Sequence, residues 1–138
     1  IVPIINKVAS KKLKIFEISG NNWDTKDGTC VRDYIHVMDL AEGHLQALEA
    51  ILKDEFRLLK INLGTGKGTS VLELLRAFQD ANNVKIPYRF SSRREGDSSF
   101  SVADNSLAKS KLNWFPKRNL KSMCIDSWNW SQKNPNGL

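Results

Sequence analysis

The order of hydrophobic and polar positions predicts a chain in which short strands and amphipathic helices follow one another. Residues 4–10 are predicted to form or end a short helix, and residues 11–18 alternate basic and apolar side chains as an exposed strand does. Residues 19–30 are rich in Gly, Asn and Asp and are predicted to form a loop. The β-branched and aromatic side chains of residues 31–37 predict a short strand after it.

From Asp39 the hydrophobic period becomes that of a helix. Asp39 suits the N-cap or the first turn and Lys53 the last turn, because a helix dipole favours negative charge at its start and positive charge at its end. A further strand is predicted over residues 57–63. We interpret His44, on this helix, as a core or boundary residue rather than a general base. One face of the helix collects Leu40, His44, Ala47, Leu48, Ile51 and Leu52.

The second half of the chain predicts three more helices and one strand. Ser70-Val-Leu-Glu73 has the pattern of a capping box and opens a helix that runs to about Ala81. The strand count is too low for a complete doubly wound sheet, so the predicted class is α/β with a small sheet. The remaining elements are a strand, a polar turn and two helices, over residues 87–91, 93–99, 106–112 and 119 or 120 to 130.

Composition narrows the class of protein. A length of 138 residues fits one domain, and 41% hydrophobic with 26% charged residues is typical of a globular chain. The formal net charge of +6 favours an anionic partner, which could be nucleic acid or a phosphorylated metabolite, and also serves solubility. The apolar runs are short and interrupted by charge, so we expect no membrane span and a cytoplasmic protein.

The first residue suggests a longer protein. The chain opens directly on apolar residues from Ile1, without a methionine, as the interior of a larger sequence would. Processing, or an expressed piece that begins there, is the alternative explanation.

Cysteine and histidine offer no metal site. Cys30 and Cys124 have no CxxC spacing, and His36 and His44 do not complete a zinc pattern with them. We interpret both cysteines as buried hydrophobic residues in a reducing compartment.

A glycine-rich segment over residues 61–70 has the strand–glycine–helix context of a phosphate-binding turn. Its spacing, Gly64-x-Gly66-x-Gly68, is neither GxGxxG nor GxxxxGK[ST], and no acidic residue follows at the end of a second strand–helix unit. We therefore interpret it as a tight turn before a helix capped by Thr69 or Ser70, and expect no cofactor-binding residue in this chain.

Two arginine-containing segments carry the candidate chemistry. Arg32 follows a glycine loop, and Arg94 and Asp97 flank Gly96. The planar guanidinium fork suits phosphate oxygens and a carboxylate suits ribose hydroxyls, so these residues could hold a nucleoside diphosphate. The alternative is an Arg32 that is solvated or paired with a neighbouring carboxylate such as Asp33, together with an ordinary polar surface turn. Composition alone favours that alternative.

The same segments resemble a known family. The chain is similar to the UDP-glucose 4-epimerases over nearly its whole length and in the same order. RDYIHV is shared widely among extended short-chain dehydrogenase/reductase proteins, whereas DGT-x-VRDYIHV with RREGD and AD is more specific. The resemblance rests on residues 27–40, 62–66, 70–74, 93–97, 103–104, 112–114 and 128–130.

The resemblance implies a part of an enzyme rather than a whole one. Residues 1–138 would be the small C-terminal UDP-sugar-binding domain of an NAD-dependent nucleotide-sugar epimerase, with the Rossmann half absent. That half would hold NAD and a YxxxK motif; no GxxGxxG opens this chain, and Tyr34 and Tyr88 lack a lysine four residues on. We expect a full-length homodimer that interconverts UDP-glucose and UDP-galactose by hydride transfer at C4, and a fragment that has no catalytic residue and is inactive alone.

The resemblance also assigns the candidate site residues. Arg32 and Arg94 would contact the diphosphate of UDP, and Asp97 the uridine ribose. Ser101 stands where epimerases restricted to glucose and galactose usually carry a tyrosine, so it would leave room for an N-acetyl group.

Two other functions stay open. A free-standing basic module that binds nucleotides or nucleic acid is supported by the net charge alone, and the scattered lysines and C-terminal cluster of tryptophans argue against nucleic acid. Another nucleotide-sugar enzyme, such as a dehydratase or decarboxylase, shares much of the pattern, and RREGD argues against it. We expect a UDP-sugar partner, no nucleic acid and no membrane.

Overall fold

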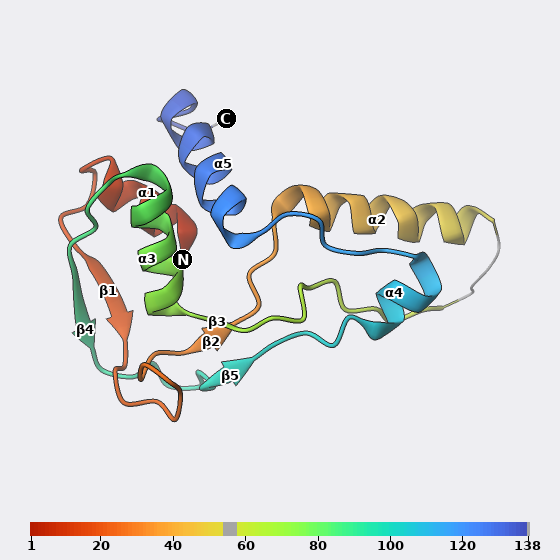
Figure 1. The fold of residues 1–138 in the computed structure, drawn as a ribbon, viewed down its shortest axis with the longest axis horizontal. Helices are drawn as coiled ribbons and strands as arrows, with labels where there is room; N and C mark the ends of the chain where they lie inside the picture. The colour runs from red at the N-terminus through yellow and green to blue at the C-terminus, as the bar shows by residue number, and fades with distance from the viewer. Residues whose placement is uncertain (54–57, 138) are drawn as a thin grey trace.

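The computed structural model describes residues 1–53 and 58–137 (Figure 1). The chain is built from short strands and helices, as the pattern predicts. No helix in these ranges combines the length and apolar character that a membrane crossing needs. In chain order the elements are α1 Val2–Ala9, β1 Phe16–Ser19, β2 Val31–Arg32, α2 Val37–Leu52, β3 Thr69–Ser70, α3 Val71–Asn82, β4 Tyr88–Ser91, β5 Phe100–Ser101, α4 Ser106–Leu112 and α5 Leu120–Lys133.

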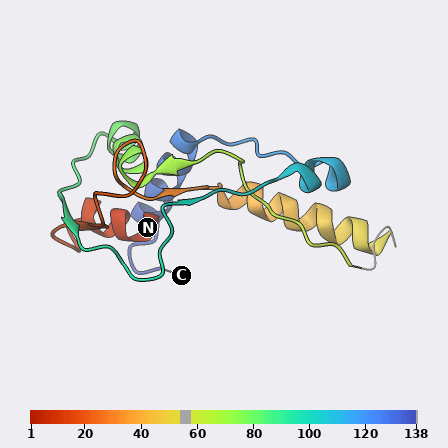
Figure 2. The same cartoon turned by 90° about the horizontal axis from the view of Figure 1, so that it is seen from below.

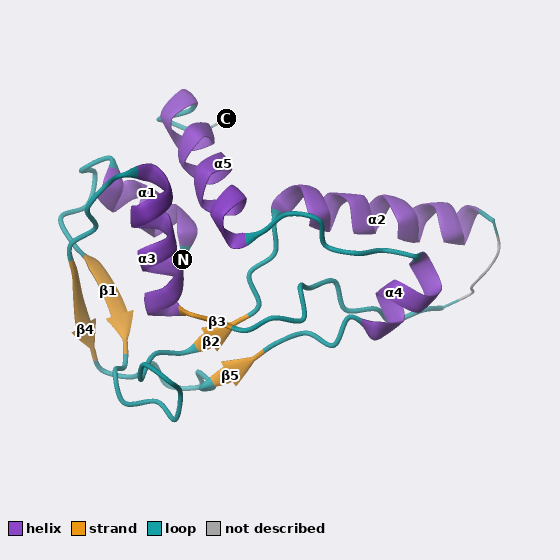
Figure 3. Cartoon of the chain, in the orientation of Figure 1, coloured by secondary structure: helices purple, strands orange, loops and turns teal. Residues whose placement is uncertain are grey.

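The strands form two small sheets. β1 and β4 pair in parallel, and β2 lies between an antiparallel β3 and a parallel β5. Figure 3 shows how short these strands are and how much of the chain between them is loop. This confirms an α/β fold with small sheets.

The hydrophobic core lies where α1, α3 and α5 meet the β1–β4 sheet, on one side of the molecule (Figure 1). Phe78 is fully buried, and its ring meets that of Trp128 edge-on with centroids 6.1 Å apart. Burial and edge-to-face contact both stabilise the α3–α5 pair. The core consists of Ile5, Val8, Phe16, Ile18, Leu72, Leu74, Leu75, Phe78, Ile86 and Cys124.

Local capping sets two helix starts, and the sequence predicts the first of these caps. The Ser70 hydroxyl accepts from the Glu73 amide at 3.0 Å, and the Glu73 carboxylate accepts from the Ser70 amide at 2.8 Å. This capping box begins α3 at Val71. Asn119 caps α5 by accepting from the Ser122 amide at 2.9 Å.

Three predicted strands are wrong in extent. Of residues 11–18 only the end is a strand, because Lys11 has a φ of 60° and turns the chain after α1. Of residues 31–37 only Val31–Arg32 is a strand, since the helix begins at Val37. Of residues 57–63, the described part from Leu58 onward is loop, and Arg57 lies outside the described residues. An apolar pattern becomes a strand only where another strand pairs with it.

α2 and α4 extend away from the core as an arm (Figures 1 and 2). The predicted apolar face of α2 is largely exposed: Leu48 is 52%, Ile51 61% and Leu52 76% exposed. His44 is exposed as well, so its assignment to the core or boundary was wrong; its ring bonds to the Leu40 carbonyl at 2.8 Å. Periodicity therefore identified the helix correctly but not what covers it.

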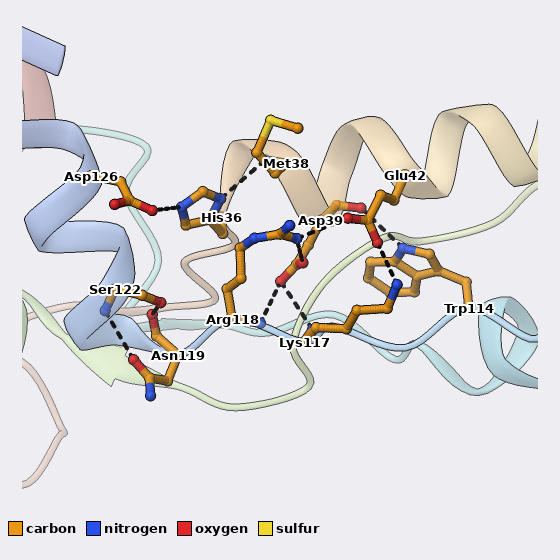
Figure 4. Close-up of polar contacts among 10 residues, drawn as sticks. All are labelled: His36, Met38, Asp39, Glu42, Trp114, Lys117, Arg118, Asn119, Ser122 and Asp126. Atoms are coloured by element: carbon orange, nitrogen blue, oxygen red, sulfur yellow. Dashed lines mark hydrogen bonds and ion pairs between the residues drawn. The ribbon is translucent and has the colours of Figure 1, made fainter.

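Asp39 anchors the start of α2 to the segment that joins α4 and α5 (Figure 4). Its fully buried carboxylate accepts from the Lys117 amide at 3.1 Å, the Arg118 amide at 3.0 Å and the Arg118 guanidinium at 2.5 Å. The Trp114 indole N–H donates to the Asp39 carbonyl at 3.0 Å. Burial alone would raise the pKa of Asp39, but the hydrogen bonds from Arg118 and Lys117 outweigh it and hold that pKa below its usual value.

His36 completes the same junction as the N-cap of α2. Its Nδ1 accepts from the Met38 amide at 3.1 Å, and its Nε2 lies 3.0 Å from an Asp126 carboxylate oxygen on α5 (Figure 4). The neutral ring meets both contacts when Nε2 carries the proton. The contacts of His36 with Met38 and Asp126 orient the start of α2 against α5. They therefore also orient β2, the strand that precedes α2.

Candidate functional site

Arg32 occupies the middle strand of the three-stranded sheet. It pairs with Thr69 of β3 on one side and with Ser101 of β5 on the other. Partners in neighbouring strands project to the same face of a sheet, so the side chains of Arg32 and Ser101 share one face. The Nη1 of Arg32 donates to the Val31 carbonyl at 2.8 Å, which fixes one side of the guanidinium.

Asp97 lies beside Arg32, although the two belong to motifs far apart in the sequence. The Arg32 Nη2 is 3.8 Å from the Asp97 Oδ1, and each side chain is 29% exposed. At this distance the contact is an ion pair rather than a hydrogen bond. Both groups therefore keep hydrogen-bonding capacity on the side that faces solvent, where a ligand could reach them.

Arg94 lies in the predicted polar turn between β4 and β5. The Asp97 amide donates to the Arg94 carbonyl at 3.3 Å, which closes the turn, and the Arg94 side chain is exposed. Over residues 1–53 and 58–137, no acidic side chain forms an ion pair with it. Its neighbour Arg93 is occupied instead, stacked over the Trp23 ring at 4.2 Å. The turn thus offers one available arginine.

Ser101 is exposed in β5 and lines a cavity of about 400 Å³ together with Arg32. The structure therefore brings three predicted site residues, Arg32, Asp97 and Ser101, to one region, and a short turn joins Arg94 to it. The other residues around the cavity are Asp33, Asn62, Leu63, Gly64, Val102, Ala103 and Asp104.

Asp33 has a role that the sequence did not reveal. Its carboxylate accepts from the Thr65 amide at 2.9 Å, the Thr65 hydroxyl at 2.5 Å and the Gly66 amide at 2.9 Å. The carboxylate that the structure pairs with Arg32 is thus Asp97 rather than its neighbour Asp33. The glycine-rich turn gives its amides to a carboxylate of this chain, and a Cβ on Gly64 would lie 2.6 Å from the Asp33 Oδ2. A short motif shows none of this, because the two segments meet only in the fold.

Burial shifts the pKa of two side chains, Tyr34 and Cys124. Burial raises the pKa of Tyr34 to about 12, and the positive charge of Arg32 offsets only part of that rise. Cys124 is buried, which raises its pKa to about 11. Over residues 1–53 and 58–137, no three His, Cys, Asp or Glu side chains gather as a metal site would require. The site is suited to binding an anionic ligand.

A larger cavity of about 1150 Å³ lies elsewhere, between α1, α5 and the start of α2. Its lining includes Val2, Met38, Met123 and Trp130 and is mostly apolar. None of the four predicted site residues borders it. Size favours this cavity, but the smaller one is lined by Arg32 and Ser101 and adjoins the Arg32–Asp97 pair, so we place the candidate site there.

Comparison with known proteins identifies the relatives of the chain. The family described as GDP-mannose 4,6 dehydratase matches residues 1–127. The UDP-glucose 4-epimerase of Bacillus subtilis (strain 168) is 49% identical over 137 residues, which are 99% of this chain and 40% of that protein. The chain thus spans about two fifths of the length of the curated relatives it matches.

Solved structures of such enzymes have the same fold. The UDP-glucose-4-epimerase of Stenotrophomonas maltophila, solved with bound NAD and formylated UDP-arabinopyranose, superposes with a TM-score of 0.93 at 44% identity and covers 97% of this chain and 40% of that one. The UDP-Glc/GlcNAc 4-epimerase of Campylobacter jejuni superposes with a TM-score of 0.85 at 33% identity and covers 96% of this chain and 40% of that one. These matches confirm the resemblance to the C-terminal part of UDP-glucose 4-epimerases. The chain belongs to the GDP-mannose 4,6 dehydratase family.

Proposed function

We propose that this chain is the UDP-sugar-binding domain of a longer, NAD-dependent UDP-glucose 4-epimerase. The observation that carries the proposal is the meeting of Arg32, Asp97 and Ser101 on one side of the β3–β2–β5 sheet, in a chain similar to enzymes solved with a UDP-sugar. The fold alone would not suffice, because one fold serves many functions.

The chemistry of the site fits a nucleoside diphosphate. The Arg32 side chain is 29% exposed and its contact with Asp97 is longer than a hydrogen bond, and Arg94 stands exposed in the adjoining turn. Two permanently charged forks match the oxygens of a diphosphate, and each charge-assisted hydrogen bond contributes about 1.5–3 kcal/mol. Asp97 accepts hydrogen bonds only, so it suits the ribose hydroxyls. Ser101 would then face the sugar.

In such an enzyme this chain anchors the nucleotide. An NAD held by the part of the protein outside this chain would supply reversible hydride transfer at C4 of the sugar. The sugar must therefore present both faces while the UDP part stays fixed. Arg32, Arg94 and Asp97 hold the part of the substrate that does not react, and that binding energy keeps the sugar at the reacting centre.

The range of sugars that we propose for this site rests on the small side chain of Ser101. Its side chain is small and exposed at the cavity rim, so a larger substituent on the sugar fits beside Arg32. A relative described as acting on both UDP-Glc and UDP-GlcNAc supports this reading. The proposed substrates are UDP-glucose, UDP-galactose and their N-acetyl counterparts. We further propose a cytoplasmic homodimer for the complete protein, which size-exclusion chromatography with light scattering tests.

The direct test is UDP binding by the complete protein in a calorimeter. Arg94→Ala is expected to weaken UDP binding by about 1–3 kcal/mol, or roughly five- to 150-fold, with the same melting temperature as the parent. Arg76→Ala on α3, which removes an equal charge from an exposed helix position, is the matched control and should leave the affinity unchanged. Equal affinities for the parent and Arg94→Ala would remove Arg94 from the site.

Two further assays separate the alternative functions. Incubation with UDP-glucose should yield UDP-galactose by NMR; loss of water or carbon dioxide instead would indicate a dehydratase or decarboxylase. Binding of mixed-sequence RNA that weakens steeply with salt, without UDP binding, would favour the basic nucleic-acid module.

A further inference from the structure

Trp23 is held in a defined position at the mouth of the loop that leads into β2. Its indole N–H donates to the Ser19 carbonyl at the end of β1, at 3.0 Å. Its backbone N–H donates to the Gly28 carbonyl at 2.9 Å, which closes the loop on itself. The ring is half-buried, so one face is available to a neighbouring side chain.

Arg93 covers that face. The Cζ of Arg93 lies 4.2 Å from the centroid of the Trp23 ring, within the range of a cation–π contact. The Arg93 Nε donates to the Asn22 Oδ1 at 2.8 Å, and its Nη2 donates to the Asn22 carbonyl. The Nε and Nη2 groups of Arg93 and one face of its guanidinium are therefore directed to the Trp23 loop.

The contact depends on a glycine. Gly20 has a φ of +82°, and a Cβ there would lie 2.4 Å from the Trp23 Nε1 and 2.9 Å from the Arg93 Cγ. A side chain at this position would collide with both partners, and the backbone conformation itself favours glycine. Strand end, indole and guanidinium thus pack in one arrangement, which we call the Trp23–Arg93 clasp.

The clasp fixes one end of the turn that carries the candidate ligands. Arg93 holds the beginning of the turn, and the ion pair with Arg32, at 3.8 Å, holds Asp97 at its end. Between them the turn is closed from the Asp97 amide to the Arg94 carbonyl, with Gly96 at a φ of +81°. Arg94 is left as the exposed cation between two fixed points.

We propose that Trp23 and Arg93 are positioning residues for nucleotide binding: the clasp holds Arg94 where a diphosphate meets it. The inference rests on the proposed function. It predicts a specific division of labour within Arg93-Arg94, in which the first arginine binds the protein and the second binds the ligand. Because the turn is fixed before the ligand arrives, less conformational freedom is lost on binding.

The test is a double-mutant cycle on UDP affinity, measured by calorimetry on the complete protein. Trp23→Leu keeps apolar bulk but removes the π face, and is expected to weaken UDP binding about tenfold by freeing the turn. Trp23→Phe keeps an aromatic face and should stay within about threefold of the parent. In an Arg94→Ala background, Trp23→Leu should change the affinity less than twofold, because the residue it positions is gone. Asp97 is held separately by Arg32.

Each outcome decides the question. A loss in Trp23→Leu that is equally large with and without Arg94 would mean a general structural role and overturn the inference. Unchanged UDP affinity in Trp23→Leu would overturn it as well, while leaving the proposed function intact. A parent protein that binds no UDP would refute the proposed function and the inference with it. Arg76→Ala, far along α3, controls for the loss of one positive charge on the surface.

Discussion

Replacing Asp39 by Asn should destabilise the protein strongly, although the two side chains have nearly the same shape. The carboxylate is fully buried and accepts hydrogen bonds from the amides of Lys117 and Arg118 and from the Arg118 guanidinium. The single amide oxygen of asparagine can accept only some of these hydrogen bonds. Its NH2 group would face the N–H donors of Lys117 and Arg118, to which it cannot hydrogen-bond. Removing one partner of a buried charged network costs about 3–5 kcal/mol, a large share of a typical stability of about 5–15 kcal/mol.

The lower end of that range applies here. The Arg118 side chain is 32% exposed, so water can hydrate its guanidinium when the carboxylate charge is lost. We therefore expect Asp39→Asn to reduce the free energy of unfolding by about 3 kcal/mol. Urea denaturation followed by tryptophan fluorescence measures it, since the buried Trp114 indole bonds to the Asp39 carbonyl and reports the same junction.

Glu42→Gln is the matched control for this experiment. Glu42 pairs with the same Arg118, at 3.0 Å, and with Lys117, at 2.7 Å, but its side chain is 29% exposed (Figure 4). Ion pairs near the surface contribute little, so this variant should lose far less stability than Asp39→Asn. Equal losses in the two variants would refute the reasoning that burial of the carboxylate decides the cost.

Three further outcomes follow from the structure. The pKa of Asp39 lies below its usual value, so the carboxylate stabilises the folded state fully at neutral pH, and this stabilisation is lost as the pH falls below about 4. Asp39→Asn should therefore flatten the acid limb of a plot of unfolding free energy against pH. An unchanged acid limb would contradict this. Ser101→Tyr should reduce turnover of UDP-N-acetylglucosamine by the complete protein more than turnover of UDP-glucose, measured by product NMR, and equal ratios would contradict the assigned position of Ser101. Cys124 is buried with a pKa of about 11, so maleimide should label it only after denaturation, and rapid labelling of the native protein would contradict its burial.

Local signals in the sequence predicted what local interactions decide. The capping box of Ser70 and Glu73 places the start of α3 without reference to the rest of the fold, and the predicted helix agrees with Val71–Asn82 to within a residue at each end. The Asn119 cap does the same for α5. A cap satisfies amides within its own first turn, so the residues that form it lie within four positions of one another.

Strand pairing and coverage could not be predicted in this way. Residues 58–63 have a strand-like composition, yet they form loop, because pairing depends on where other segments lie. The apolar face of α2 is present in the sequence, but Ile51 and Leu52 remain exposed in the described part of the chain. The hydrophobic period indicates that one face of a helix is apolar, but only the tertiary structure shows what that face contacts.

The residues of the candidate site are brought together by strand pairing that no local pattern indicates. β2 and β5 are parallel neighbours, with Val31 opposite Phe100 and Arg32 opposite Ser101, and a parallel pair needs a long connection between its strands. That connection carries α2, β3, α3, β4 and the turn with Arg94 and Asp97. A shift of one residue in this register would send Ser101 to the opposite face from Arg32 and dismantle the cavity. The whole connection sets the register, and neither motif does so alone. A resemblance that extends over the whole connection can therefore indicate the site. The two motifs taken separately indicate only an arginine in a strand and a polar turn.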